Sequence, residues 1–249
     1  MKKLKILFFI FVMLCTTKVY ALENNNGIEI DEFDYSNLLN LGFTELEILN
    51  MSLEEFENNK NLSGRIVYQR VYPTMIPYSN GSTITEYKTM IMTIIKINNQ
   101  YRYKVSLEWK KNPKVRSYDI IGIGIPTNVR VDTNSIYFQQ NYCTSSTDCT
   151  TNKISTLSST STGVTSVFQL PSGFYTTLNS YLYFNVSKNT NSIISRLYAY
   201  GDYAHAVKNI SLANAKRHNI NSNGIVLNNT IIDYYDAIST AVATYNTSW

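Results

Sequence analysis

The spacing of hydrophobic and polar residues changes near residue 60. Before it, apolar residues recur at helical intervals, and after it they alternate with a period of two. Thr44 and Ser52 each precede a glutamate by three residues, which is typical of a helix N-terminus closed by a capping box. Gly42 suits the end of a helix. The pattern predicts short helices over residues 35–41, 45–50 and 53–58.

The clearest alternation lies in Gln100–Trp109. Tyrosine, valine, leucine and tryptophan share one face, whereas Arg102 and Lys104 lie on the other. This is typical of a half-buried strand with one face in solvent. Residues 88–97 precede it across Asn98-Asn99, which predicts a hairpin. Further strands are predicted at residues 65–72, 116–125, 135–142, 164–170, 180–186, 196–207 and 224–228.

This series of short strands predicts a mainly β fold, an antiparallel β-sandwich with a short N-terminal helical segment. Residues 233–245 fit either a helix or a strand, and the alternation around Ala241 and Ala243 favours a strand. The Ser/Thr-rich residues 151–163 fit a surface loop or an exposed edge hairpin. A pore-forming hairpin remains an alternative, although its apolar positions do not alternate as a membrane strand requires.

The N-terminus has the pattern of a secretory signal peptide. Three lysines within the first five residues precede the unbroken apolar run Ile6–Cys15, and Val19 and Ala21 stand at the −3 and −1 positions of a cleavage site. The run is half the length of about 20 residues that a transmembrane helix needs. We expect cleavage after Ala21, secretion to the extracellular space, and no transmembrane span in the mature chain. The expected organisation is a signal peptide (1–21), an acidic helical segment (22–60) and a β-sandwich domain (61–249).

Charge is distributed unevenly along the mature chain. The full sequence has 22 Lys+Arg and 18 Asp+Glu, and four of the lysines fall in the signal peptide. The mature chain is therefore neutral, which argues against a nucleic-acid partner. Residues 22–60 hold ten acids and one base, whereas residues 61–249 hold eight acids and 17 bases.

This asymmetry, with the apolar side chains of residues 22–60, predicts that the helical segment docks on the β-sandwich. Leu46, Leu49, Leu53 and Phe56 are expected to make the contact. The acids are expected near the basic turn Lys110–Arg116.

Few residues point to chemistry. Cys143 and Cys149 remain after cleavage, and an even count in an oxidising compartment predicts a disulfide. The two histidines, His205 and His218, do not form a metal-ligand motif, so no metal and no cofactor are expected. Asp202 and His205 are three residues apart, and on one regular strand they point to opposite faces. We expect no enzymatic activity.

Aromatic and basic residues suggest binding instead. On one face of the predicted strand at residues 196–207, Arg196, Tyr198, Tyr200 and Asp202 place two aromatic rings between a cation and an anion. This arrangement suits recognition of a sugar or a peptide. The basic turn Lys110–Arg116 suits an anionic polymer, such as a teichoic acid or a sulfated glycan.

Two stretches also carry a resemblance. Leu41-Gly42-Phe43-Thr44-Glu45, continuing to Phe56, together with Tyr198–Ala206, resembles a functionally uncharacterised group of exported proteins of Gram-positive bacteria. The similarity runs from about residue 35 to the end of the chain. The resemblance implies export and brings no functional residues with it.

The observations together favour a secreted, non-enzymatic binding protein that recognises a cell-wall glycan, a host glycan or another anionic surface polymer. Two alternatives stay open. One is an extracellular carboxylate-dependent hydrolase, for which Asp233 and Asp236 form the one local pair of acids in the β body. The other is a pore-forming or matrix protein.

Overall fold

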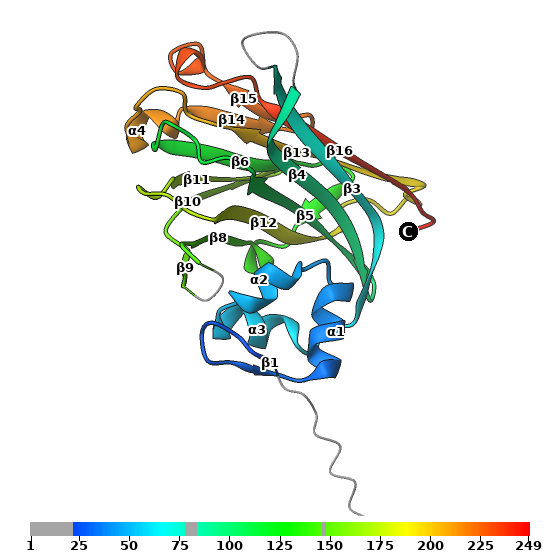
Figure 1. Cartoon of the computed structure of the whole chain (residues 1–249). Coiled ribbons are helices and arrows are strands. Elements are labelled where there is room, and N and C mark those ends of the chain that lie inside the picture. The colour runs from blue at the N-terminus through cyan, green and yellow to red at the C-terminus, as the bar shows by residue number, and fades with distance from the viewer. Residues whose placement is uncertain (1–21, 78–83, 146–147) are drawn as a thin grey trace, which may run out of the picture.

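The chain is described by a computed structural model over residues 22–77, 84–145 and 148–249. The predicted signal peptide, with Val19 and Ala21, lies outside the described residues. Every pairing between the described strands is antiparallel. Two sheets stack face to face, with the three N-terminal helices on one side (Figure 1). This confirms the predicted antiparallel β-sandwich with an N-terminal helical segment.

Two sheets form the sandwich. The larger sheet has the order β3 (Gly64–Pro77), β4 (Ile84–Ile97), β5 (Gln100–Trp109), β12 (Thr177–Lys188), β8 (Tyr137–Cys143) and β9 (Cys149–Asn152), with β7 (Val129–Val131) also paired to β12. The smaller sheet has the order β10 (Thr156–Thr160), β11 (Gly163–Gln169), β6 (Tyr118–Gly124), β13 (Arg196–Ala204) and β16 (Ser239–Asn246).

The space between the sheets holds an apolar core. Val105, Leu107 and Phe184 from the larger sheet meet Ile123 and Leu197 from the smaller one, and all five are fully buried. These side chains come from the apolar positions of alternating strands. The burial of apolar surface at about 25 cal/mol per Å² is the main force holding the two sheets together.

The helical segment, residues 22–60, packs on the outer face of the larger sheet (Figure 1). Its helices start at the predicted caps: Thr44 and Glu47 form a full capping box, and Ser52 accepts from the backbone N–H of Glu55. The segment comprises β1 (Leu22–Glu23), β2 (Glu29–Ile30), α1 (Glu32–Asn40), α2 (Glu45–Leu49) and α3 (Leu53–Asn59).

Docking of this segment follows the prediction in outline and corrects it in detail. The buried contacts come from Leu38, Leu41, Phe43, Ile48, Met51 and Phe56, which pack against Ile95, Ile97, Tyr181 and Tyr183. Of the four residues expected at the interface, only Phe56 belongs to this cluster. Leu46 and Leu49 are half-buried outside it, and Leu53 is 60% exposed. Among the described residues, no ion pair joins the acids of the segment to Lys110–Arg116. Glu47 instead pairs with Lys104 on β5, because that strand runs beneath α2 and the basic turn does not.

The helical segment also makes the prediction of a solvent-exposed face on β5 wrong, because it covers that face. Arg102 and Lys104 were placed on a solvent face, yet they are 2% and 1% exposed. Their partners lie some 40 to 60 residues earlier in the chain, so no local pattern reveals that this face is covered.

The outer face of the smaller sheet is covered by later elements, namely α4 (Leu212–Ala215), β14 (His218–Asn221) and β15 (Gly224–Leu227). The hairpin of β14 and β15 lies so close to β6 that a Cβ on Gly124 would stand 2.4 Å from the carbonyl oxygen of Asn221. The Gly122–Gly124 stretch thus permits a close approach of backbones.

The structure also decides predictions that the sequence left open for residues 233–245 and 151–163. The predicted strand within residues 233–245 is present as β16, and a short 3-10 turn, η2 (Ile232–Tyr234), precedes it. A second such turn is η1 (Thr133–Ser135). The Ser/Thr-rich residues form the edge strand β10 and its turn to β11, as one of the two predicted alternatives stated. Within the described ranges, no helix is long and apolar enough to span a membrane.

Candidate functional site

The predicted binding stripe lies on β13. Arg196 is exposed and its Nε donates to the Asn246 side chain at 3.2 Å. The rings of Tyr198 and Tyr200 are half-buried, with centroids 6.3 Å apart and planes at 83°. These three residues thus form a small aromatic and cationic surface at one end of the smaller sheet.

Asp202 does not complete this stripe, which corrects the prediction. Its side chain is 2% exposed, and the backbone N–H of Ile225 donates to Oδ2 at 2.6 Å. Burial raises the pKa of the Asp202 carboxyl. Gly224, at φ +112°, lets β15 lie directly over this carboxylate. A hairpin distant in sequence therefore covers the position that strand alternation assigns to solvent.

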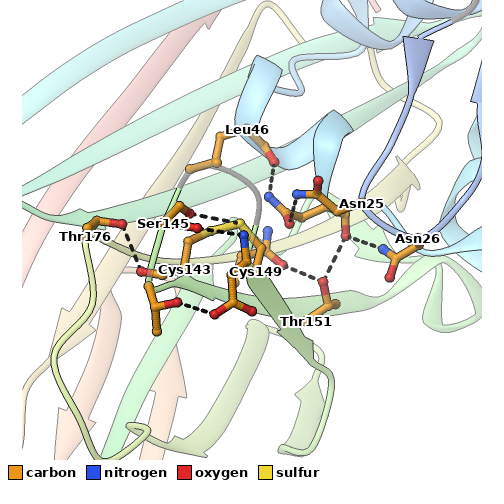
Figure 2. Close-up of a disulfide and its surroundings, with 12 residues drawn as sticks. Asn25, Asn26, Leu46, Cys143, Ser145, Cys149, Thr151 and Thr176 are labelled. Carbon is orange, nitrogen blue, oxygen red and sulfur yellow. Dashed lines mark hydrogen bonds between the residues drawn. A yellow bond between two sulfur atoms is a disulfide. The ribbon is translucent and has the colours of Figure 1, made fainter.

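The disulfide between Cys143 and Cys149 was predicted and is present, with an S–S distance of 2.09 Å. It joins β8 to the edge strand β9, where Figure 2 shows it beside the helical segment. On β9, Thr151 donates to the carbonyl oxygen of Asn50 at 3.0 Å, and Gln139 on β8 donates to the same oxygen at 2.9 Å. The cross-link thus holds a strand that helps to seat the helical segment.

The outer face of the larger sheet is polar beneath the helices. Lys104 contacts the Glu47 carboxylate and also donates to the carbonyl oxygen of Gly42 at 2.7 Å. Ser106 donates to the other Glu47 oxygen at 2.9 Å. Lys104 and Glu47 are each only 2% exposed at the side chain. This is a buried ion pair whose remaining polar atoms have partners, the condition under which such a pair is tolerated.

A second buried acid lies close by. Glu55 is fully buried and accepts a hydrogen bond from the Tyr181 hydroxyl at 2.6 Å, while its Oε1 has no partner among the described residues. Burial raises the pKa of Glu55 to about 8, against the opposing effects of Tyr181 and Lys104. The carboxyl is therefore mostly protonated at neutral pH.

A pocket of about 270 Å³ opens where the helical segment meets the sheet. We call it the junction pocket. Its lining combines tyrosines, amide side chains and an arginine. The lining residues are Glu54, Asn58, Asn59 and Leu62 from the helical segment, Arg102, Tyr183 and Asn185 from the sheet, and Asn134, Ser135, Ile136 and Tyr137 from η1 and the start of β8.

Arg102 anchors this pocket. Its Nη1 donates to Asn59 Oδ1 at 2.7 Å and its Nε to Asn185 Oδ1 at 2.9 Å. The guanidinium lies 4.4 Å from the centre of the Tyr183 ring, a cation–π distance. Tyr137 stacks on Tyr183 with centroids 5.4 Å apart and planes at 20°. The pocket wall therefore combines a stacked tyrosine pair, of which Tyr137 is the more exposed, with a fixed cation.

The rim of the junction pocket carries one acid, Glu54. Its carboxylate pairs with Lys153 at 2.9 Å, and the Lys153 ammonium lies 5.1 Å from the centre of the Tyr137 ring. Glycoside hydrolysis needs two carboxylates that face one bond from opposite sides. The junction pocket supplies a single rim carboxylate, because Glu55 and Glu47 lie outside its lining.

The basic turn between β5 and β6 borders a second, more open pocket of about 370 Å³. Arg116 lines it and donates through Nη2 to Asn112 Oδ1 and to the carbonyl oxygen of Gly173, both at 2.9 Å. Tyr142 and Tyr175 pack edge to face beside it, with centroids 4.9 Å apart. Arg116 is thus held as part of a loop framework.

The histidines have structural partners. His205 Nδ1 lies 3.1 Å from both oxygens of the buried Asp119, and His218 Nε2 lies 2.9 Å from the Thr165 hydroxyl. Asp202 is not among the partners of His205 in the described part of the chain. Over the same residues, no group of three or more His, Cys, Asp or Glu side chains could hold a metal ion.

No family model and no curated protein sequence matches the chain. Among solved structures, it is similar to BcpA, the major pilin subunit of Bacillus cereus, at 10% identity and a TM-score of 0.39. That match covers 75% of this chain and 47% of the pilin chain, so this chain spans about half the length of the pilin.

Two further similar structures are collagen-binding domains. One is the collagen-binding subdomain of Enterococcus faecalis surface protein ACE, at 10% identity and a TM-score of 0.35, which covers 60% of this chain and 89% of that one. The other belongs to Erysipelothrix rhusiopathiae surface protein RspB, at 8% identity and a TM-score of 0.34, with 74% and 65% covered. At such low identities and TM-scores, these likenesses carry no argument about function.

Proposed function

We propose that the protein is a secreted, non-enzymatic binding protein that recognises a glycan, with the sugar seated in the junction pocket. The observation that carries the proposal is the composition of this pocket. The stacked pair of the half-buried Tyr137 and the buried Tyr183 supplies apolar faces to its wall, and four asparagines and a serine offer hydrogen bonds in several directions. Small-molecule sites combine such apolar faces with a few fixed polar groups.

The size of the junction pocket limits the ligand. Small-molecule sites run from roughly 300 to 1,000 Å³, and the pocket volume of about 270 Å³ is at the lower end. One sugar residue of a chain is therefore the expected occupant, with the rest of the polymer outside the pocket. The disulfide supports extracellular location, because such bonds persist in oxidising compartments.

A glycan array with the secreted protein tests the proposal. Asn58→Ala and Asn134→Ala change exposed pocket residues whose side chains make no described hydrogen bond, so folding should be retained. Each should weaken binding about fivefold, the loss expected for one hydrogen bond of about 1 kcal/mol. An array without any bound glycan would overturn the proposal.

The stripe on β13 supplies the matched control. Tyr198→Ala with Tyr200→Ala removes both half-buried rings from a surface that belongs to the other sheet. If the junction pocket is the site, this double variant should bind the same glycans as the parent protein. Loss of binding in the double variant, with the two asparagine variants unaffected, would assign the glycan to the stripe instead.

A further inference from the structure

Two cationic side chains, Arg102 and Lys104, lie on the same face of β5. Among the described residues, only Lys104 forms an ion pair with a carboxylate. Lys104 pairs with Glu47, whereas the neighbouring Arg102 makes its described hydrogen bonds to the amide oxygens of Asn59 and Asn185. No described carboxylate oxygen lies within the 4.0 Å of an ion pair to Arg102. Arg102 is nevertheless 2% exposed.

The acids nearest to Arg102 do not balance its charge. Glu55 interacts with it electrostatically, but burial keeps the pKa of Glu55 at about 8 and its carboxyl mostly neutral. Glu54 at the pocket rim is already paired with Lys153. The Tyr183 ring offsets part of the charge through its quadrupole. The guanidinium is therefore a buried cation held by neutral groups.

A cation in this condition favours an anionic ligand. A buried charge without a counter-ion is costly, and an arriving carboxylate would reduce that cost. Arginine has five N–H donors in a planar fork that matches the two oxygens of a carboxylate. Only two of the five are used in the described hydrogen bonds, and Arg102 lines the junction pocket.

We infer that the junction pocket binds a carboxylate-bearing sugar, with the carboxylate on Arg102 and the sugar ring against the tyrosines. This inference rests on the proposed function and adds the ligand class. Arg102 and Lys104 differ here in a way that the sequence does not reveal: the protein supplies one counter-ion itself and leaves the other to the ligand.

Glucuronate and glucose provide a suitable pair of probes, because they differ only in a carboxylate in place of a hydroxymethyl group. Isothermal titration of the secreted protein should give glucuronate an affinity roughly ten- to hundredfold above that of glucose, the gain expected from hydrogen bonds to a charged group. The glycan array should show the same preference for acidic members.

Asn185→Asp tests the role of Arg102 without removing it. Asn185 Oδ1 already accepts from Arg102 Nε at 2.9 Å, so the substitution supplies a counter-ion within the protein. We expect a higher melting temperature than in the parent protein and the loss of most of the preference for glucuronate, measured as the ratio of the glucuronate and glucose affinities of the same variant. Asn185→Ala, which removes the amide and adds no charge, is the matched control and should not raise the melting temperature.

The possible outcomes distinguish failure of this inference from failure of the proposed function. Equal affinity for glucuronate and glucose, or a preference for glucuronate that survives in Asn185→Asp, would overturn the inference and leave glycan binding intact. Binding of neutral glycans alone would do the same. If no glycan binds, both the inference and the proposed function fail. A lower melting temperature of Asn185→Asp would also count against an unbalanced charge on Arg102.

Discussion

The two faces of the larger sheet are both buried, but by different chemistry. The inner face presents Val105, Leu107 and Phe184 to the smaller sheet. The outer face presents Arg102, Lys104 and two tyrosines to the helical segment. Apolar burial is non-directional and proportional to area, whereas buried polar groups need partners in fixed places. Both faces therefore contribute stability, and the outer face in addition needs donors and acceptors at defined positions.

This difference explains where the candidate site lies. Where Val105, Leu107 and Phe184 meet the smaller sheet, the close-packed apolar core leaves no room for a ligand. The polar outer face must meet a donor or acceptor at each position, and where the helical segment meets this face the junction pocket remains beside Arg102. Substitutions on the two faces should accordingly have different consequences.

The largest expected effect is on the outer face, at Lys104. Lys104→Met leaves the buried Glu47 carboxylate without its counter-ion, and the free energy of unfolding should fall by about 3–5 kcal/mol. Adding Glu47→Gln should restore much of this loss, because the amide oxygen can still accept from the Thr44 backbone N–H and the amide nitrogen can donate to the Ser106 hydroxyl. Urea denaturation of the two single variants and the double variant measures both effects.

The apolar core between the inner face and the smaller sheet supplies the control for this pair. Leu197→Ala in the apolar core should cost about 2–5 kcal/mol by creating a cavity. Combined with Glu47→Gln, its cost should simply add, since the two sites share no partner. If the stability losses of Lys104→Met and Glu47→Gln also simply add, with no stability recovered in the double variant, the two faces do not differ in this way.

The same contrast decides how far the sequence could predict the structure. Alternation in β5 correctly predicted a strand and its inner, apolar face. It failed for Arg102 and Lys104, since long basic side chains at alternate positions look like a solvent face. Their partners, Asn59 and Glu47, lie in the helical segment. Non-local covering of this kind leaves no local signal.

The binding stripe failed in part for the same reason. Arg196, Tyr198 and Tyr200 lie at least partly at the surface, where alternation placed them, but β15 covers Asp202. Caps and cysteines were more informative, because their chemistry is local: Thr44 caps α2, and Cys143 and Cys149 are six residues apart. The junction pocket was missed entirely, because it forms between segments that are distant in the sequence.

The next largest expected effect is a pH dependence of folding stability that arises from Glu55. Its pKa is raised from 4.5 to about 8 in the folded protein, mainly by burial. The folded state therefore keeps a proton that the unfolded state loses, and stability from this group is full below pH 4.5 and falls as the pH rises to about 8. The loss should be on the order of a few kcal/mol.

Glu55→Gln isolates this contribution. The amide oxygen can still accept from the Tyr181 hydroxyl, and the side chain no longer titrates. The other groups that face Glu55, namely Lys104, Glu47, Tyr183 and Tyr137, are unchanged. Melting temperatures of the two proteins should be similar at pH 4.5 and diverge by pH 8, where the variant is the more stable. Parallel curves would show that Glu55 does not bind the extra proton.

The smallest expected effect concerns Lys153 and Glu54, an ion pair between the same two layers as Lys104 and Glu47. The side chains are 35% and 70% exposed, so water and salt screen the charges. A double-mutant cycle with Lys153→Ala and Glu54→Ala should give a coupling energy of about 0–1 kcal/mol, declining with added salt. Both pairs join a lysine to a glutamate and they differ strongly in burial, so the ratio of their coupling energies reports mainly what burial adds. A coupling energy at Lys153 as large as that at Lys104 would mean that burial does not strengthen ion pairs at this interface. The contrast between the two faces would then have no physical basis.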